Sequence, residues 1–84
     1  MESPTSASTV RIMAFGIAAE KMGSNATTAA GIADLDTLQV WLFNNYPELA
    51  NLKISIAVNK NIVLENILLH NGDEVALLPP FSGG

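Results

Sequence analysis

Two apolar segments at opposite ends of the chain, with one amphipathic segment between them, restrict the fold more than any other feature. Residues 10–15 and 75–78 are both of strand length and almost entirely apolar, and Gly16 ends the first of them. Runs of this kind are typical of strands that are covered on both faces, in the middle of a sheet. The sequence therefore predicts that two strands distant along the chain meet in one sheet.

The segment between them carries a strong helical signal. Its apolar residues recur at helical spacing: Leu38, Trp41, Leu42 and Tyr46. Asp36, followed three residues later by Gln39, resembles a capping box with Asp in the Ser or Thr position. Pro47 closes the segment because proline cannot continue a helix. We expect a helix from about residue 37 to 46 with one buried face, in which Trp41 and Phe43 serve core packing rather than base stacking or a ligand cage.

Shorter elements complete the pattern. We expect a short helix at 18–22 that ends at Gly23, a weak returning strand within 24–32, a half-buried strand with Ile54, Ile56 and Val58, a turn at 59–61, a short strand at 62–64 and a tight turn at 71–73. A mixed sheet packed on one main helix is the ubiquitin-like β-grasp fold of the α+β class. The expected limits are a flexible N-terminal tail at 1–8, the β-grasp domain at 9–80 and an extended C-terminal functional tail at 81–84.

Charge and hydropathy argue against nucleic-acid and membrane partners. The formal net charge is −4, and the four strong bases are scattered without a stripe that could neutralise a phosphate backbone: Arg11, Lys21, Lys53 and Lys60. The apolar runs are far shorter than a bilayer requires. The first residues lack the basic and apolar regions of a secretory signal. We therefore expect a cytosolic protein.

The residue types for catalysis or metal binding are scarce. The chain has no cysteine, which excludes disulfides, a thiol nucleophile and a thiolate metal site. His70 is the only histidine, and no acids and histidines have the spacing of metal ligands. The paired acids at 34 and 36 and at 73 and 74 are interpreted as charges at a helix start and a turn. We expect no metal site, and we do not expect the chain to be an enzyme on its own.

The C-terminal segment points to a function. It reads Leu78-Pro79-Pro80-Phe81-Ser82-Gly83-Gly84. The two prolines lock φ and donate no hydrogen bond, so they should end the sheet and direct the following residues away from the body. Ser82, Gly83 and Gly84 would make a thread thin enough for a narrow tunnel in another protein. The four residues from Leu78 to Phe81 are predicted to border the partner interface, with Phe81 as its anchor. A terminal Gly-Gly alone could equally be a frayed end without a function.

The last fourteen residues, 71–84, resemble the closing signature of the small subunit of molybdopterin synthase, in the MoaD/ThiS sulfur-carrier family. The similarity also includes 57–59, 46–49 after the helix, and Phe15-Gly16 with Ala19-Glu20. A Pro-Pro-x-Ser-Gly-Gly ending separates this family from its relatives in thiamin synthesis and tRNA thiolation. Phe81 departs from the family, where an aliphatic residue is common.

The resemblance implies a carrier chemistry at the carboxylate of Gly84. An E1-like adenylating and sulfur-transferring enzyme would use ATP to make a glycyl adenylate and then a thiocarboxylate, which donates sulfur to a pterin precursor. The resemblance also implies no permanently bound cofactor, a catalytic site in the partner large subunit and a heterotetramer with it. Because the chain has no cysteine, only that carboxylate could hold the sulfur covalently. The alternatives are a carrier for thiamin or tRNA thiolation, a ubiquitin-like protein modifier, and a binding module whose tail is incidental.

Overall fold

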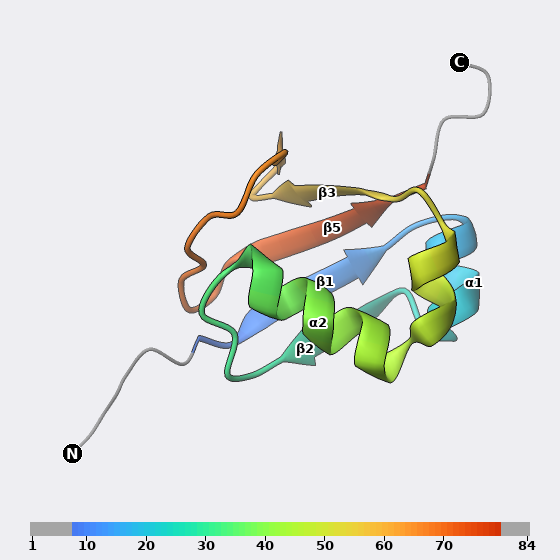
Figure 1. The fold of residues 1–84 in the computed structure, drawn as a ribbon, viewed down its shortest axis with the longest axis horizontal. Helices are drawn as coiled ribbons and strands as arrows, with labels where there is room; N and C mark the ends of the chain where they lie inside the picture. The colour runs from blue at the N-terminus through green and yellow to red at the C-terminus, as the bar shows by residue number, and fades with distance from the viewer. Residues whose placement is uncertain (1–7, 80–84) are drawn as a thin grey trace.

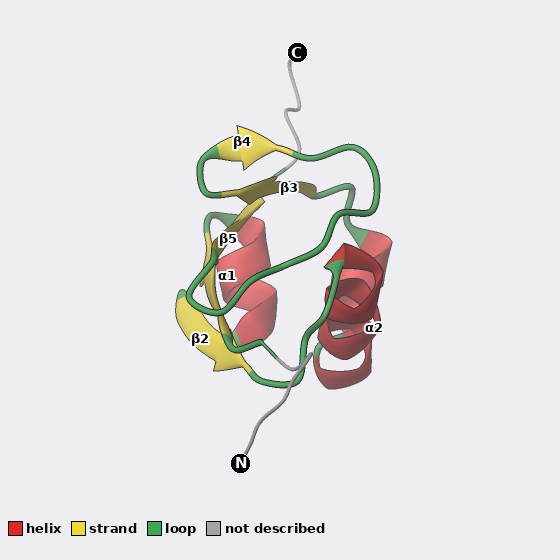
Figure 2. Ribbon diagram, turned by 90° about the vertical axis from the view of Figure 1, so that its left-hand side faces the viewer, coloured by secondary structure: helices red, strands yellow, loops and turns green. Residues whose placement is uncertain are grey.

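The computed structural model describes residues 8–79, which form a five-stranded mixed sheet with its helices packed on one face (Figures 1 and 2). The elements in chain order are β1 Val10–Ala14, α1 Ile17–Met22, β2 Ala26–Ala29, α2 Leu35–Asn45, the 3-10 helix η1 Pro47–Asn51, β3 Ser55–Val58, β4 Asn61–Ile62 and β5 Glu74–Leu78. This arrangement confirms the predicted α+β class and the ubiquitin-like β-grasp fold.

The first and last strands are neighbours at the centre of the sheet, whose order is β2-β1-β5-β3-β4. β1 and β5 run parallel, and the other three pairs are antiparallel. The predicted returning strand is β2, beside β1. The turns also lie where glycine and asparagine predict them: φ is 50° at Asn59, 75° at Lys60 and 89° at Gly72. The strand expected at 62–64 is shorter and is paired only at residues 61 and 62.

Helix α2 begins earlier than its local sequence predicts. The N-cap is Asp34, whose Oδ1 accepts a 2.9 Å hydrogen bond from the Thr37 N–H, so the Asp36 capping box is wrong. The Asp36 N–H instead donates to Oδ1 of Asn66, and the Leu35 N–H donates to the carbonyl of Ile67. A distant segment therefore satisfies the first turn of the helix, and no local pattern could have shown this.

The core lies between the sheet and the helices. It contains three residues of α2, Leu35, Leu38 and Leu42, packed with apolar residues of β1, β3, β5 and both other helices. Trp41, which we expected to be buried, is only half-buried and packs at the edge of the core, where its ring centroid lies 6.1 Å from that of Tyr46. Phe43, for which we also expected core packing, is exposed. The helix therefore has a buried aliphatic face with Trp41 and Tyr46 at its edge.

Two strands differ from their expected coverage. β1 was predicted to be covered on both faces, but Arg11 is exposed because no described helix covers that side of the sheet (Figure 2). β3 was predicted to be half-buried, yet Ile56, Ala57 and Val58 are all buried. Its neighbours β5 and β4 flank it, and a small side chain such as that of Ala57 is hidden between theirs.

The described chain begins at Ser8, the last residue of the predicted N-terminal tail. Its hydroxyl donates to the carbonyl of Leu69 at 3.2 Å, and its carbonyl accepts from the Ile32 N–H at 3.0 Å. Within residues 8–79, no helix has the length and apolar character needed to cross a membrane.

Candidate functional site: the exit end of the sheet

The C-terminal segment leaves the domain beside the loop between β1 and α1. Because β1 and β5 are parallel neighbours, both strands finish at the same end of the sheet, which we call the exit end (Figure 1). The last bond between them runs from the Phe15 N–H to the carbonyl of Leu77 at 3.2 Å. The β5 chain therefore leaves the sheet against residues 15 and 16, far from its start at Glu74.

Pro79 is the last described residue, and it lies against Gly16. A Cβ added to Gly16 would stand 3.3 Å from both the Cβ and the Cγ of Pro79, which is closer than ordinary contact. Gly16 has φ 60° and ψ −133°, a conformation that residues with a side chain rarely adopt. The predicted interface residues Leu78 and Pro79 are both half-buried at this end. The remaining predicted site residues, Pro80, Phe81, Ser82, Gly83 and Gly84, lie outside the described residues.

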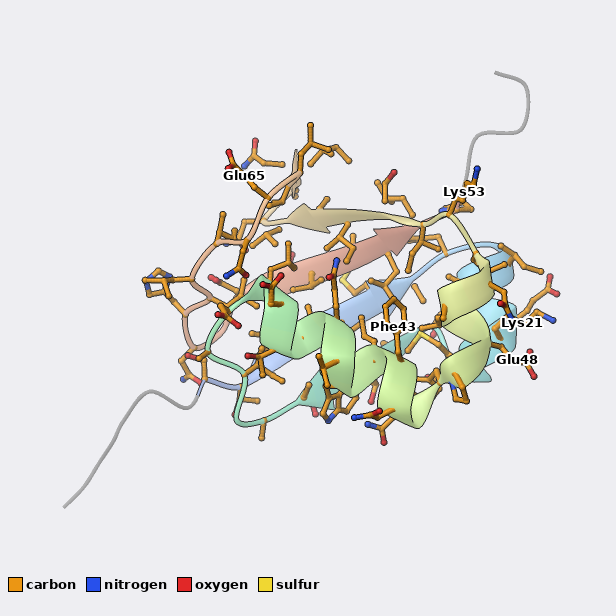
Figure 3. The ribbon with its side chains drawn as sticks, viewed as in Figure 1. Lys21, Phe43, Glu48, Lys53 and Glu65 are labelled. Carbon is orange, nitrogen blue, oxygen red and sulfur yellow. The ribbon has the colours of Figure 1, made fainter. Side chains whose placement is uncertain are left out.

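Charges of both signs surround the exit end. Lys21 of α1 and Glu48 of η1 form an ion pair at 3.3 Å, and Lys53 precedes β3 (Figure 3). The register that pairs Ser55 with Leu78 places Lys53 close to where the described chain ends. Residues 8–79 contain no group of three His, Cys, Asp or Glu side chains that could hold a metal ion. The described part of the exit end therefore offers a scaffold rather than reactive groups.

The face of the sheet opposite the helices carries an apolar surface that reaches the exit end. We call this surface the open face; its apolar residues are Met13, Phe15, Ala57, Ile62, Ala76 and Leu78. Four of them form one row across four strands, because the registers align Met13, Ala76, Ala57 and Ile62. Phe15 is 44% exposed and Ile62 is 53% exposed. An ion pair at 3.7 Å between Arg11 and Glu74 borders the row at the far side from the exit.

Of the open-face residues, the sequence predicts only Leu78 as functional. A signal for two others was present, because alternation along β1 places Met13 and Phe15 on the same face as the charged Arg11. An exposed arginine marks a face in contact with solvent, so the two apolar residues on that face are also accessible. Ile62 gave no comparable signal, since its strand is only two residues long.

The paired acids and the histidine lie at the opposite end of the sheet, as the interpretation of turn and helix-start charges requires. The His70 side chain is exposed, and the backbone N–H of His70 donates to Oδ2 of Asp73 at 2.8 Å. The amide of Asn59 donates to Oδ1 of Asp73, and the Glu74 N–H donates back to Asn59. Burial raises the pKa of Asp73, but these hydrogen bonds and the nearby His70 outweigh it and leave the pKa below its usual value. The pKa of Asp34 is also lowered, mainly by hydrogen bonds from Thr37.

Comparisons with known proteins show the family and confirm the fold. The model of the ThiS family matches residues 12–84. The human molybdopterin synthase sulfur carrier subunit is 32% identical over 82 residues, covering 89% of this chain and 93% of the relative. The solution structure of small archaeal modifier protein 1 from Methanosarcina acetivorans matches with a TM-score of 0.78 and 25% identity, covering 93% of this chain and 98% of that one. A chain of the complex of subunits 1 and 2 of molybdopterin-converting factor from Helicobacter pylori matches with a TM-score of 0.69 and 26% identity, covering 90% and 99%.

Proposed function

Because the chain belongs to the ThiS family, we propose that it carries sulfur on the carboxylate of Gly84 for molybdenum cofactor biosynthesis. The observation that carries this proposal is the 32% identity with a sulfur carrier subunit, together with a family match that extends to Gly84. The family match and the identity with a sulfur carrier subunit establish the family of the chain. The biosynthetic pathway and the role of Gly84 are what we propose.

The proposed reaction begins with activation of a poor electrophile. The Gly84 carboxylate attacks the α-phosphorus of ATP on an E1-like enzyme, which forms an acyl adenylate and releases pyrophosphate. A persulfide on the sulfur donor then adds to the acyl carbon and AMP leaves, which gives an acyl disulfide. A second thiol of the sulfur-transferring enzyme attacks the donor-side sulfur, forms a disulfide with the donor and releases the thiocarboxylate. Its sulfur is a better nucleophile than a carboxylate oxygen and attacks the pterin precursor. The carrier itself supplies no catalytic group, and its contribution is to deliver the terminal atoms in the correct position.

The proposed partner in the second step is a large catalytic subunit, in a heterotetramer. The Helicobacter pylori neighbour is described as a complex of subunit 1 with subunit 2 of molybdopterin-converting factor. In this chain the apolar residues of the open face extend along β1 and β5 to Phe15 and Leu78, next to the root of the C-terminal segment at Pro79. We propose that this surface docks on the large subunit while Ser82, Gly83 and Gly84 enter its active site, with Pro80 and Phe81 at the entrance. No resident cofactor is needed, and the cytosol supplies the ATP.

A protein-modifier function is the second candidate. The Methanosarcina acetivorans neighbour is named a small archaeal modifier protein, and it shares 25% identity and the whole fold with this chain. The same adenylate would then be attacked by a lysine amine of a target protein to form an isopeptide bond. Carriers for thiamin synthesis or tRNA thiolation would use the same thiocarboxylate with a different acceptor.

Intact mass spectrometry of the protein from its native cells distinguishes these functions. A sulfur carrier appears partly as a species heavier by the exchange of one oxygen for sulfur, whereas a modifier appears in larger conjugates.

Reconstitution with the activating enzyme, ATP, a sulfur donor, the large subunit and the pterin precursor then tests the acceptor. Deletion of Gly84 should nearly abolish the pterin dithiolene, because the new carboxylate on Gly83 is displaced by about 3.3–3.6 Å. Gly83→Val should hinder entry of the thread without moving the carboxylate. Near-normal product from the Gly84 deletion would refute the assignment.

A further inference from the structure

Gly16 and Pro79 make a contact between two segments at opposite ends of the chain. From it we infer that Gly16 is a positioning residue, which seats the Pro79 ring and thereby sets the direction in which the C-terminal segment leaves the domain. This inference rests on the proposed function, because direction matters only if the segment must reach a reaction centre. It concerns a residue in the β1–α1 loop that does not itself touch the transferred sulfur.

The backbone of Gly16 is held on both sides. Before it, the Phe15 N–H donates to the Leu77 carbonyl at 3.2 Å, the last bond between the two central strands. After it, the carbonyl of Gly16 accepts from the Glu20 N–H at 3.2 Å, the first bond of helix α1. Gly16 is therefore fixed relative to the sheet and to α1. The close contact of 3.3 Å between an added Cβ and Pro79 would have to be relieved by movement of Pro79 rather than of the loop.

Pro79 depends on packing for its position. Proline has no N–H, so it cannot extend the β1–β5 ladder beyond Leu77. Its ring is half-buried against Gly16, where the absence of a side chain leaves room for it. A side chain at residue 16 would push the ring outward by a few tenths of an ångström. The residue after Pro79 is also a proline, which fixes its own φ and restricts the backbone of Pro79 before it.

A shift at the root of the C-terminal segment changes where its far end can reach. Five residues separate Pro79 from the carboxylate of Gly84, so that carboxylate can lie at most about 16–18 Å from Pro79. A misplacement of about 1 Å at a reaction centre can reduce a rate about 100-fold. We therefore expect Gly16→Ala to reduce the turnover of thiocarboxylate formation roughly 10- to 100-fold. The KM for the carrier should stay within about twofold, because the substitution leaves every other exposed side chain of the domain unchanged.

The matched control is Gly31→Ala. Gly31 also has a positive φ, 77°, but nothing lies within 4 Å of a Cβ added there. Both variants carry backbone strain, so both should lower the thermal midpoint, and only Gly16→Ala should lose turnover. If Gly16→Ala does not fold, Pro79→Ala replaces it, because it removes the ring from its contact with Gly16 without backbone strain at residue 16 and should lower turnover in the same way.

A double-variant cycle separates the contact from the strain. Pro79→Gly removes the two ring atoms that the new Cβ would meet, so Gly16→Ala should have little further effect on turnover in that background. Each variant is measured by intact mass with the activating enzyme, ATP and a sulfur donor. Equal turnover for the two alanine variants, or an undiminished effect of Gly16→Ala beside Pro79→Gly, would overturn this inference alone. Failure of the wild-type chain to form any thiocarboxylate would overturn the proposed function as well.

Discussion

Replacement of Phe15 by alanine tests whether the open face binds the large subunit. Phe15 is 44% exposed. A phenylalanine side chain can bury about 200 Å² in all, so a partner could still cover about 90 Å² of it. At about 25 cal/mol per Å² this area is worth about 2 kcal/mol, or about a 30-fold change in Kd. We expect isothermal titration calorimetry of Phe15→Ala with the large subunit to show a loss of this size.

Phe43→Ala is the matched control, because Phe43 has the same side chain and a similar exposure of 37%, but lies on α2 at the opposite face of the sheet (Figure 3). Each substitution should lower the free energy of unfolding by about 3 kcal/mol, since a little over half of each ring, about 110–125 Å², is already covered. Only Phe15→Ala should weaken the complex. An equal loss of affinity for both variants, or an unchanged Kd for Phe15→Ala, would show that the open face is not the docking surface.

Three further predictions concern stability and are checked by thermal or urea unfolding. Leu42→Ala should lower the free energy of unfolding by about 2–5 kcal/mol, but Trp41→Ala by only about 2 kcal/mol, because Leu42 is fully buried and Trp41 is half-buried. A larger loss for Trp41→Ala than for Leu42→Ala would refute this placement of the core. Asp34→Ala should lower the thermal midpoint by a few degrees through loss of the N-cap, whereas Asp36→Ala should leave it unchanged. For Asp73, the lowered pKa means that the carboxylate stabilises the folded state above the ordinary aspartate pKa of about 3.9, and that this stabilisation is lost as the pH falls through the folded-state pKa. The stability difference between wild type and Asp73→Asn should therefore shrink as the pH falls below about 4.

The fold could be predicted from the sequence because its strongest signals are local and mutually consistent. Apolar runs, helical spacing and turn residues all identify elements without knowledge of distant contacts. What could not be predicted depends on which segments meet. The true cap of α2 at Asp34 is reinforced by Asn66, and the coverage of Ala57 depends on its strand neighbours. Arg11 could have shown that one face of β1 is open, but a run of apolar residues on both sides of it predicted a covered strand.

The candidate site shows the same division. The motif of the C-terminal segment is readable in the sequence because its chemistry depends on residue type and order. The contact of Pro79 with Gly16 cannot be read from the sequence, because no pattern links two residues that meet only through the parallel pairing of the first and last strands. A glycine before a helix is common enough to be interpreted as a strand end. Only the fold shows that its missing side chain leaves room for the chain that exits the sheet.

Strand β5 is held at both ends, and the two attachments should be separable by experiment. At its start, Asp73 and Asn59 connect it to the β3–β4 turn, and at its end Leu77 accepts from Phe15 before the chain passes Gly16. Loss of the hydrogen bond between Asp73 and Asn59 should lower the fraction of folded protein without changing the exit, since this attachment is the farther one from the exit end. Loss of the second acts on the direction of the exit while most of the core remains. If the protein is a carrier, substitutions at Asn59 should therefore reduce stability with unchanged turnover per folded molecule, whereas those at Gly16 should reduce turnover itself.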